Sequence, residues 1–358
     1  MNDYDINDKR TQKEFSGITF SQFKKTEVRK QLVNAILYNK LEESCYWSAE
    51  YICSGHFVDL WEIILLLLGK HIHIGNPKLS IYLELRLNYF KEMLNNGYLD
   101  NEIKMRNNLK IRELFAEIMC VMCLSRKKNS FDVPKIPQEE YNILRISYKL
   151  EADSLEYAKN VFHNEDPKEM FIALNELAFN MKNNIKNMAK SIYWIEWLLG
   201  FETLSKKENN LVFFGARRTY SVAPQFQKDI VWIIWDLIME EAKSRNKGIV
   251  KIINAINQLF CLRYSSGAKK KRKYLIFYCV ALLTEYVDNS VKIINNSELI
   301  EQIKKKINVI YKQIKVNEIT PNTDYLFNNS YNSGNLEKTI ERLEKMNSLT
   351  NLIPRSEK

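Results

Sequence analysis

The densest cluster of charged side chains in the sequence is cationic and follows a turn of small residues. Residues 265–273 read Ser-Ser-Gly-Ala-Lys-Lys-Lys-Arg-Lys. Exposed amides at a helix N-terminus, together with neighbouring cations, favour phosphate oxygens. The sequence therefore predicts a surface that binds nucleic acid, and three arginines from the same part of the chain extend it. The candidate residues are Lys269, Lys270, Lys271, Arg272, Lys273, Arg263, Arg217 and Arg218.

Two other interpretations of this cluster are a solvated turn and a phosphate-binding loop. A run of cations at a helix start is as often a solvated turn as a binding site, so its composition alone does not decide between the two. A Walker-type phosphate loop is excluded, because that motif needs lysine directly after Gly267 and a second glycine five residues earlier. The chain has Ala268 and Leu262 at those two places.

Cysteine and histidine could together form a zinc site. The six cysteines lie at positions 45, 53, 120, 123, 261 and 279, and the four histidines at 56, 71, 73 and 163. Structural zinc sites use two tight pairs of ligands separated by a short knuckle, whereas the candidate pairs here are far apart and lie within or beside helices. We therefore expect no metal ion and no cofactor.

Several carboxylates recur inside apolar, helical stretches. Two acids four residues apart can share a metal ion or perform acid–base chemistry, although pairing with a nearby lysine explains most such cases. No known hydrolase, kinase or dinucleotide-binding motif is present, so catalysis would need a cryptic site. We expect no enzymatic activity, with a metal-dependent enzyme as the weakest alternative. The carboxylates are Glu50, Glu62, Glu117, Glu196, Asp236 and Glu240.

Composition places these residues in a helical protein. The 358 residues are 46% apolar and carry a formal net charge of +10, while Gly (10) and Pro (7) are too scarce for the turns of a sheet-rich fold. Cysteines in apolar contexts suit a reducing compartment. The N-terminus lacks the pattern of a signal peptide, and the longest apolar run, residues 274–283, is too short to cross a bilayer. We expect neither secretion nor membrane insertion.

Helical periodicity divides the chain into two units. A flexible N-terminus (1–20) precedes a first helical unit (21–125), and a linker with bridging helices (126–166) leads to a second unit (167–315). Residues 205–226 form an insertion predicted as a short β-hairpin or ordered loop. A polar tail (316–358) ends with a short amphipathic helix built on Leu336, Ile340 and Leu343. The predicted helices begin near residue 24 and continue at 42–54, 57–70, 78–95, 109–125, 167–187, 189–204, 226–245, 248–263 and 270–290.

The two units share a spacing that indicates duplication. A single offset of 170 residues aligns Asp59 with Asp229, Asn76 with Asn246 and Phe90 with Phe260, and keeps the intervening apolar positions in register. A duplicated helix–turn–helix leaves such an ungapped match. The alternative is that two amphipathic helices of similar length share their apolar phase by chance. Shared Asp and Asn at the helix boundaries favour duplication, because both types stabilise helix ends.

Three segments resemble uncharacterised proteins of large nucleocytoplasmic DNA viruses that infect protists. They are residues 45–57 (CYWSAEYICSGHF), 70–77 (KHIHIGNP) and 229–235 (DIVWIIW). The resemblance covers about residues 20–316 and implies a viral protein of the host cytoplasm, in a viral factory, or of the virion. It carries no known activity or catalytic residue. The tandem five-helix units are also similar to those of cyclins and B-type transcription factors, by helix number alone.

These observations lead to one preferred hypothesis and one main alternative. The preferred hypothesis is a non-enzymatic, all-α viral protein that binds nucleic acid through a basic face during viral transcription or replication. The alternative is a structural or assembly scaffold that binds other viral proteins through apolar helix faces and the tail helix.

Overall fold

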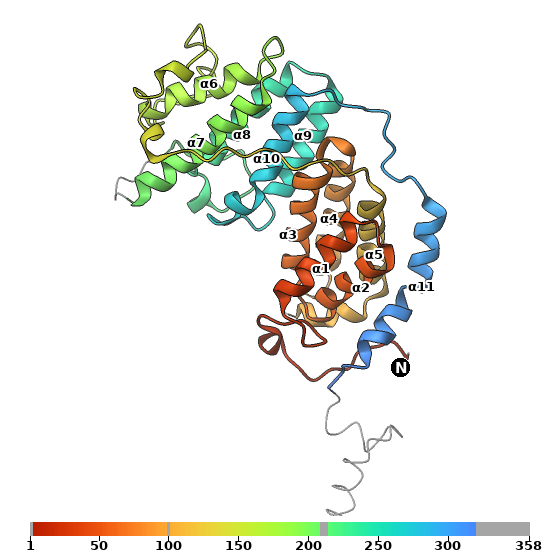
Figure 1. The fold of residues 1–358 in the computed structure, drawn as a ribbon. Coiled ribbons are helices and arrows are strands. Elements are labelled where there is room, and N and C mark those ends of the chain that lie inside the picture. Colours follow the sequence, from red (N-terminus) through yellow and green to blue (C-terminus); the bar gives the residue numbers. More distant parts are fainter. Residues whose placement is uncertain (1–2, 99–100, 208–213, 320–358) are drawn as a thin grey trace, which may run out of the picture.

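The computed structural model describes residues 3–98, 101–207 and 214–319, and these residues fold into helices joined by loops (Figure 1). The described residues contain no strand, only an isolated bridge between Ile18 and Lys24. The predicted all-α fold class is therefore confirmed. Among the described helices, none combines the length and apolarity that crossing a bilayer requires.

The first bundle consists of five helices close to the predicted ranges. Leu67 ends the third helix as an α-helix, but the chain continues as a π-helical turn, Leu68–Ile72, and a short 3-10 turn, His73–Gly75. The remaining helix boundaries lie within a few residues of the prediction. The helices are α1 (Lys25–Leu37), α2 (Leu41–Cys53), α3 (Phe57–Leu67), α4 (Leu79–Asn95) and α5 (Leu109–Leu124).

The second bundle also has five helices, and its last helix is central to the whole fold. Every residue from 275 to 284 in that helix is buried, because it packs against helices of both bundles. Gly69 permits the closest approach: a Cβ placed there would lie 2.8 Å from the carbonyl carbon of Tyr274. The helices are α6 (Phe171–Met181), α7 (Met188–Lys207), α8 (Val231–Lys243), α9 (Lys247–Phe260) and α10 (Ala268–Thr284).

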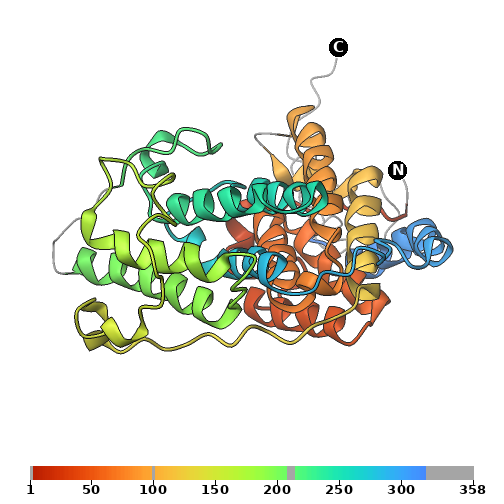
Figure 2. The same cartoon turned by 90° about the horizontal axis from the view of Figure 1, so that it is seen from above.

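Two helices join the bundles. The helix α9 packs along α4, and α10 packs on α3 and the π-helical turn. Seen from above, the teal and cyan helices α9 and α10 lie between the green helices of the second bundle and the red and orange helices of the first (Figure 2). The Tyr278 hydroxyl in α10 also donates to the carbonyl of Pro77, at 2.9 Å. The apolar core is therefore continuous across the two bundles.

The segment 126–166 lacks the predicted bridging helices. It begins as an extended strap and then forms only short 3-10 turns at Gln138–Tyr141 and Ser147–Lys149. Side chains of α6 satisfy its backbone: Glu176 accepts the amides of residues 151 and 152, and Asn175 accepts those of residues 157 and 158. Because these bonds replace helical ones, the segment is ordered without being helical.

The predicted second unit, residues 167–315, ends on the first bundle. Its final helix, α11 (Ser297–Lys315), packs against α5 and α2. Figure 1 shows the chain leaving α10 and running back along the first bundle to reach this helix. Of the predicted polar tail, residues 316–319 are described, and the amphipathic segment around Ile340 lies outside the described residues.

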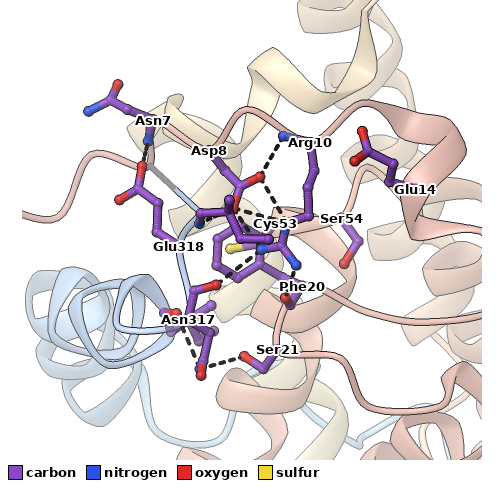
Figure 3. A network of polar contacts seen from close by, with 12 residues as sticks. Asn7, Asp8, Arg10, Glu14, Phe20, Ser21, Cys53, Ser54, Asn317 and Glu318 are labelled. Carbon is purple, nitrogen blue, oxygen red and sulfur yellow. Dashed lines mark hydrogen bonds and ion pairs between the residues drawn. The ribbon is translucent and has the colours of Figure 1, made fainter. Parts of the chain in front are cut away.

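The N-terminal segment was predicted to be flexible, but residues 3–20 pack on the first bundle and on the end of α11. Phe15 and Phe20 are fully buried, and the Arg10 guanidinium lies over both rings. Arg10 also pairs with Asp8 at 2.7 Å and donates to the carbonyl of Asn317 (Figure 3). The sequence looked polar because the few apolar residues of this segment are widely spaced, yet Ile6, Phe15 and Phe20 are all buried.

The offset of 170 residues aligns buried apolar residues but not equivalent polar ones. Phe90 and its counterpart Phe260 are both buried. In contrast, the side chain of Asn246 caps α9 by accepting the amide of residue 249, whereas Asn76 is buried and donates to Ser125 Oγ at 3.0 Å. Asn76 and Asn246, one of the two polar pairs that favoured duplication, thus lie in unlike surroundings. The cyclin-like duplication remains a prediction.

The insertion predicted at 205–226 is described in part. The helix α7 continues to Lys207, residues 208–213 lie outside the described residues, and residues 214–223 form an irregular loop. Arg217 and Tyr220 fasten this loop to Asp236 on α8, at 3.1 and 2.6 Å. The described part therefore matches the ordered loop rather than the β-hairpin.

The close contact at Gly69 leads to a stability prediction. Gly69→Ala should destabilise the protein by about 1–3 kcal/mol, because the added methyl group must displace the backbone of α10. Gly267→Ala is the control: a Cβ there meets nothing within 4 Å, so we expect a change within about 0.5 kcal/mol. Urea unfolding measures both. Equal effects of the two substitutions would contradict this account of α10 packing.

Candidate nucleic-acid interface

Residues 269–273 form the first turns of α10, and the helix divides their five cations between two faces. Lys269 is 4% exposed and Arg272 is 3% exposed, and Lys273 is half-buried. Lys270 and Lys271 are exposed. Positions three and four residues apart share a helix face, so 269, 272 and 273 turn inward together. The predicted cationic cluster is therefore two sets of side chains with different surroundings.

The three inward cations each pair with a carboxylate on another helix. Lys269 Nζ lies 2.7 Å from Glu202 of α7, and Lys273 Nζ lies 2.9 Å from Glu196 of the same helix. Arg272 pairs with Glu62 of α3 and donates to a backbone carbonyl of α9. A buried cation costs several kcal/mol unless it is paired, so loss of the partner of Lys269 or Arg272 would destabilise the fold. Lys269 and Arg272 are not available to phosphate.

Arg217 is also part of the protein interior. Its guanidinium lies 2.6 Å from Asp166 and 3.1 Å from Asp236. Burial of Asp166 opposes its charged form, but hydrogen bonds from Arg217 and from the amides of residues 163 and 215 hold the pKa of this carboxyl below its ordinary value. These ion pairs fasten the loop before α8 to the rest of the second bundle.

The remaining candidates are on the surface. Arg263 is exposed but pairs with Glu102 at 3.2 Å. Within the described part of the chain, Lys270, Lys271 and Arg218 are exposed and form no ion pair. Of the eight residues predicted to bind nucleic acid, five are thus neutralised by acids of this chain, and these three are not.

Lys271 lies at a pocket that residues of α1 complete. The pocket has a volume of about 210 Å³ and is lined by Lys25 and Arg29 of α1, Asp59 and Glu62 of α3, and Lys271. Lys25 Nζ neutralises Asp59 at 2.9 Å, and Arg272 neutralises Glu62. Arg29 is exposed and forms no ion pair among the described residues, so the charges of Arg29 and Lys271 remain uncompensated. Lys25, Arg29, Lys270 and Lys271 are called the junction surface below.

Sequence reasoning did not include Lys25 and Arg29. Their spacing of four residues places both on one face of a helix, but nothing in the sequence indicates that α1 lies beside α10, which follows more than 200 residues later. A signal for the inward cations was present. Lys269 and Arg272 are in helical phase with Ile276 and Cys279, which are buried, so the cations share the core-facing side of α10.

The carboxylates that could have formed a catalytic site are engaged in structural contacts. Glu50 accepts from the Ser21 hydroxyl, and the other five each pair with a cation. The pairs are Glu62 with Arg272, Glu117 with Arg86 and Lys304, Glu196 with Lys273, Asp236 with Arg217, and Glu240 with Lys243. Their recurrence inside apolar helices is explained by these partners.

The cysteines and histidines do not form the predicted zinc-ligand combinations, although Cys45 Sγ lies 4.0 Å from Cys120 Sγ in the core. Among the described residues, no group of three or more His, Cys, Asp or Glu side chains is arranged to hold a metal ion. Burial raises the pKa of both Cys123 and Cys261 to about 11, so these thiols stay protonated at neutral pH. The His73 ring lies 2.9 Å from the carbonyl of Asn129, and His56 contacts carbonyls of the N-terminal segment.

The tryptophans are core residues. Trp61, Trp194, Trp197, Trp232 and Trp235 are buried. The sixth, at position 47, is partly buried and packs against the core. The pairs Trp194 with Trp197 and Trp232 with Trp235, each three residues apart, therefore serve packing and do not present a platform on which bases could stack.

Comparisons with protein families, with curated proteins and with solved structures give no match for this chain. The candidate interface is therefore argued from charge and contacts within the chain.

The ion pair between Lys269 and Glu202 leads to the second prediction. Lys269→Met should lower the free energy of unfolding by about 3 kcal/mol, because Glu202 stays buried with only the more exposed Lys206 as a partner. Lys270→Met, one residue along the same helix turn, should change it by no more than about 0.5 kcal/mol. Urea unfolding of both variants measures the difference. Similar free energies of unfolding for the two variants would show that Lys269 does not face the interior while Lys270 faces solvent.

The depressed pKa of Asp166 leads to a pH prediction. Because the folded-state pKa lies below the ordinary value of 3.8, the stabilisation is complete above that value and is lost as the pH falls through the folded-state pKa. Asp166→Asn should therefore be less stable than the wild type at neutral pH, with a gap that narrows below about pH 4. Thermal unfolding between pH 2 and pH 7 measures this gap. A gap that is constant across this range would contradict the assignment.

Proposed function

We propose that the protein binds nucleic acid, without catalysing a reaction, through the junction surface of Lys25, Arg29, Lys270 and Lys271. The observation that carries the proposal is that Lys271 and Arg29 line one pocket whose two acids, Asp59 and Glu62, pair with other cations, and that neither Lys271 nor Arg29 forms an ion pair among the described residues. This surface retains two of the predicted residues, Lys270 and Lys271, and replaces the inward ones with cations of α1.

Electrostatics supports phosphate as the ligand of this surface. The helix α10 begins at Ala268, so its free amides and the positive end of its dipole lie within the turn that carries Lys270 and Lys271. The two lysines repel each other and the helix dipole, and an anion relieves both repulsions. A polyanion also gains from counterion release at several cations together. The net charge of +10 adds long-range attraction.

The resemblance to proteins of large DNA viruses suggests the biological setting. In this proposal the protein acts on viral nucleic acid during transcription or replication, in the host cytoplasm or the virion. The engaged state of the candidate carboxylates favours a binding role over a catalytic one.

Charge reversal at the junction surface tests the proposal. The triple variant Arg29→Glu, Lys270→Glu, Lys271→Glu should bind a labelled 20-base-pair duplex or an RNA strand at least about tenfold more weakly at 0.1 M salt. The slope of log K against log salt should also fall by about 2–3, one contact being lost at each position. Anisotropy titrations at several salt concentrations measure both quantities.

A matched control separates local from general charge effects. Lys168→Glu, Lys247→Glu and Lys251→Glu together change the net charge by the same amount at exposed positions away from the junction surface. This variant should keep the wild-type slope. Equal losses in both triple variants, or no loss in either, would reject the junction surface. A stoichiometric protein partner, with no nucleic-acid binding at physiological salt, would instead favour the role of assembly scaffold.

A further inference from the structure

An apolar groove runs between α2 and α11 on the first bundle. Its volume is about 480 Å³, the largest among the pockets described here. Its apolar lining comes from Tyr46 of α2 and from Leu299, Ile303, Val309 and Ile310 of α11. Val309 is 58% exposed. This groove lies on the first bundle, apart from the junction surface of α1 and α10.

The helix α11 has two apolar stripes, one fully buried and one half-buried. The covered stripe consists of Ile300, Ile307, Tyr311 and Ile314, all buried. The second stripe consists of residues 299, 303 and 310, which recur at the spacing of one helix face. Their side chains line the groove. The half-buried stripe and the exposed Val309 leave apolar surface in water, and a second packing partner would gain about 25 cal/mol for each Å² of it that becomes covered.

We propose that residues 336–347 of this same chain occupy the groove as an amphipathic helix. These residues lie outside the described part of the structure. Leu336, Ile340 and Leu343 recur at steps of four and three, which predicts one apolar face. The apolar face of this proposed helix has the same residue spacing as the second stripe on α11. The side chains of the two helices would therefore interdigitate along the groove.

Charges beside the groove match those beside the apolar face. Glu337 and Glu344 follow Leu336 and Leu343, so they border one edge of the proposed helix, where they would meet Lys306 on the α11 wall. Arg342 lies toward the other edge, where it would meet Glu42 on the α2 wall, since the neighbouring Glu43 already pairs with Lys40. This complementarity selects one orientation of the helix across the groove.

The connection is long enough for the segment to return. Residues 320–335 span up to about 50 Å when extended, whereas the 19 residues of α11 extend about 28 Å. The end of α11 therefore lies within reach of the whole groove. Because the segment is attached to the same chain, its effective concentration at the groove is about millimolar, which favours it over a second copy at low protein concentration.

Disulfide trapping in the full-length chain tests the proposal. All six native cysteines are buried, so introduced cysteines at exposed positions should react selectively. Val309→Cys with Ile340→Cys pairs the groove with the apolar face, and Val309→Cys with Lys345→Cys pairs it with the opposite face as a matched control. Under mild oxidation the first pair should cross-link within the monomer at least about tenfold faster than the second.

Each outcome decides the proposal. Equal rates for the two pairs, or no monomeric cross-link, would overturn it, and a cross-linked dimer whose yield rises with protein concentration would assign the groove to a second copy. A second readout avoids cross-linking: Leu336→Asp, Ile340→Asp and Leu343→Asp together should increase maleimide labelling of Val309→Cys about fivefold or more. Unchanged labelling would contradict the proposal, and neither readout depends on nucleic-acid binding.

Discussion

Pairing of buried cations with acids from other helices is the constraint on which this fold depends. Lys269 and Arg272 sit at the start of α10, a place where the helix dipole already disfavours positive charge. Each becomes tolerable in the interior only because Glu202 of α7 or Glu62 of α3 lies against it. The same ion pairs hold α10 between the two bundles. Neutralising the buried cations and positioning the helix therefore depend on the same contacts. The apolar residues 275–284 then complete the core.

Toward the ends of the described chain, buried arginines are likewise paired with groups from other segments, and several of their acceptors are amide and carbonyl oxygens. Arg112 is 1% exposed, lies 3.9 Å from the ring centroid of Tyr311, and donates to the side-chain oxygens of Asn107 and Asn308. It thereby ties α5 to α11, while Arg10 ties the N-terminal segment to the residues after α11 (Figure 3). Buried arginines satisfied by oxygens of distant segments thus close the first bundle.

Local periodicity predicted the ten helices of the two bundles but missed α11, and it did not show which charges lie inside. The boundaries of α2, α4 and α5 follow from apolar spacing and from turn residues such as Asn76. The partition of residues 269–273 depends on acids more than 60 residues away in sequence, which no local pattern reveals. Sequence reasoning missed Arg29 for the same reason, because tertiary packing alone brings it to the pocket that Lys271 lines.

The N-terminal segment and α11 show a second limit of sequence reasoning. Composition suggested that residues 1–20 were loose, yet Phe15 and Phe20 are buried. For α11 the apolar pattern was present, but it could not indicate that the chain returns to the first bundle after passing through the second. A low density of apolar residues is thus a weak guide to order when the few that are present, such as Phe15 and Phe20, are buried in the core.

The measurement that tests the division of the α10 cations most directly is the rate of lysine acetylation, read by mass spectrometry, in the native protein with and without an oligonucleotide. Our account predicts that Lys270 and Lys271 react at least about tenfold faster than Lys269, since a buried, paired amine is shielded from reagent. It also predicts that the oligonucleotide slows acetylation of Lys270 and Lys271 and leaves Lys269 unchanged. Equal rates for the three lysines in the free protein would contradict the account.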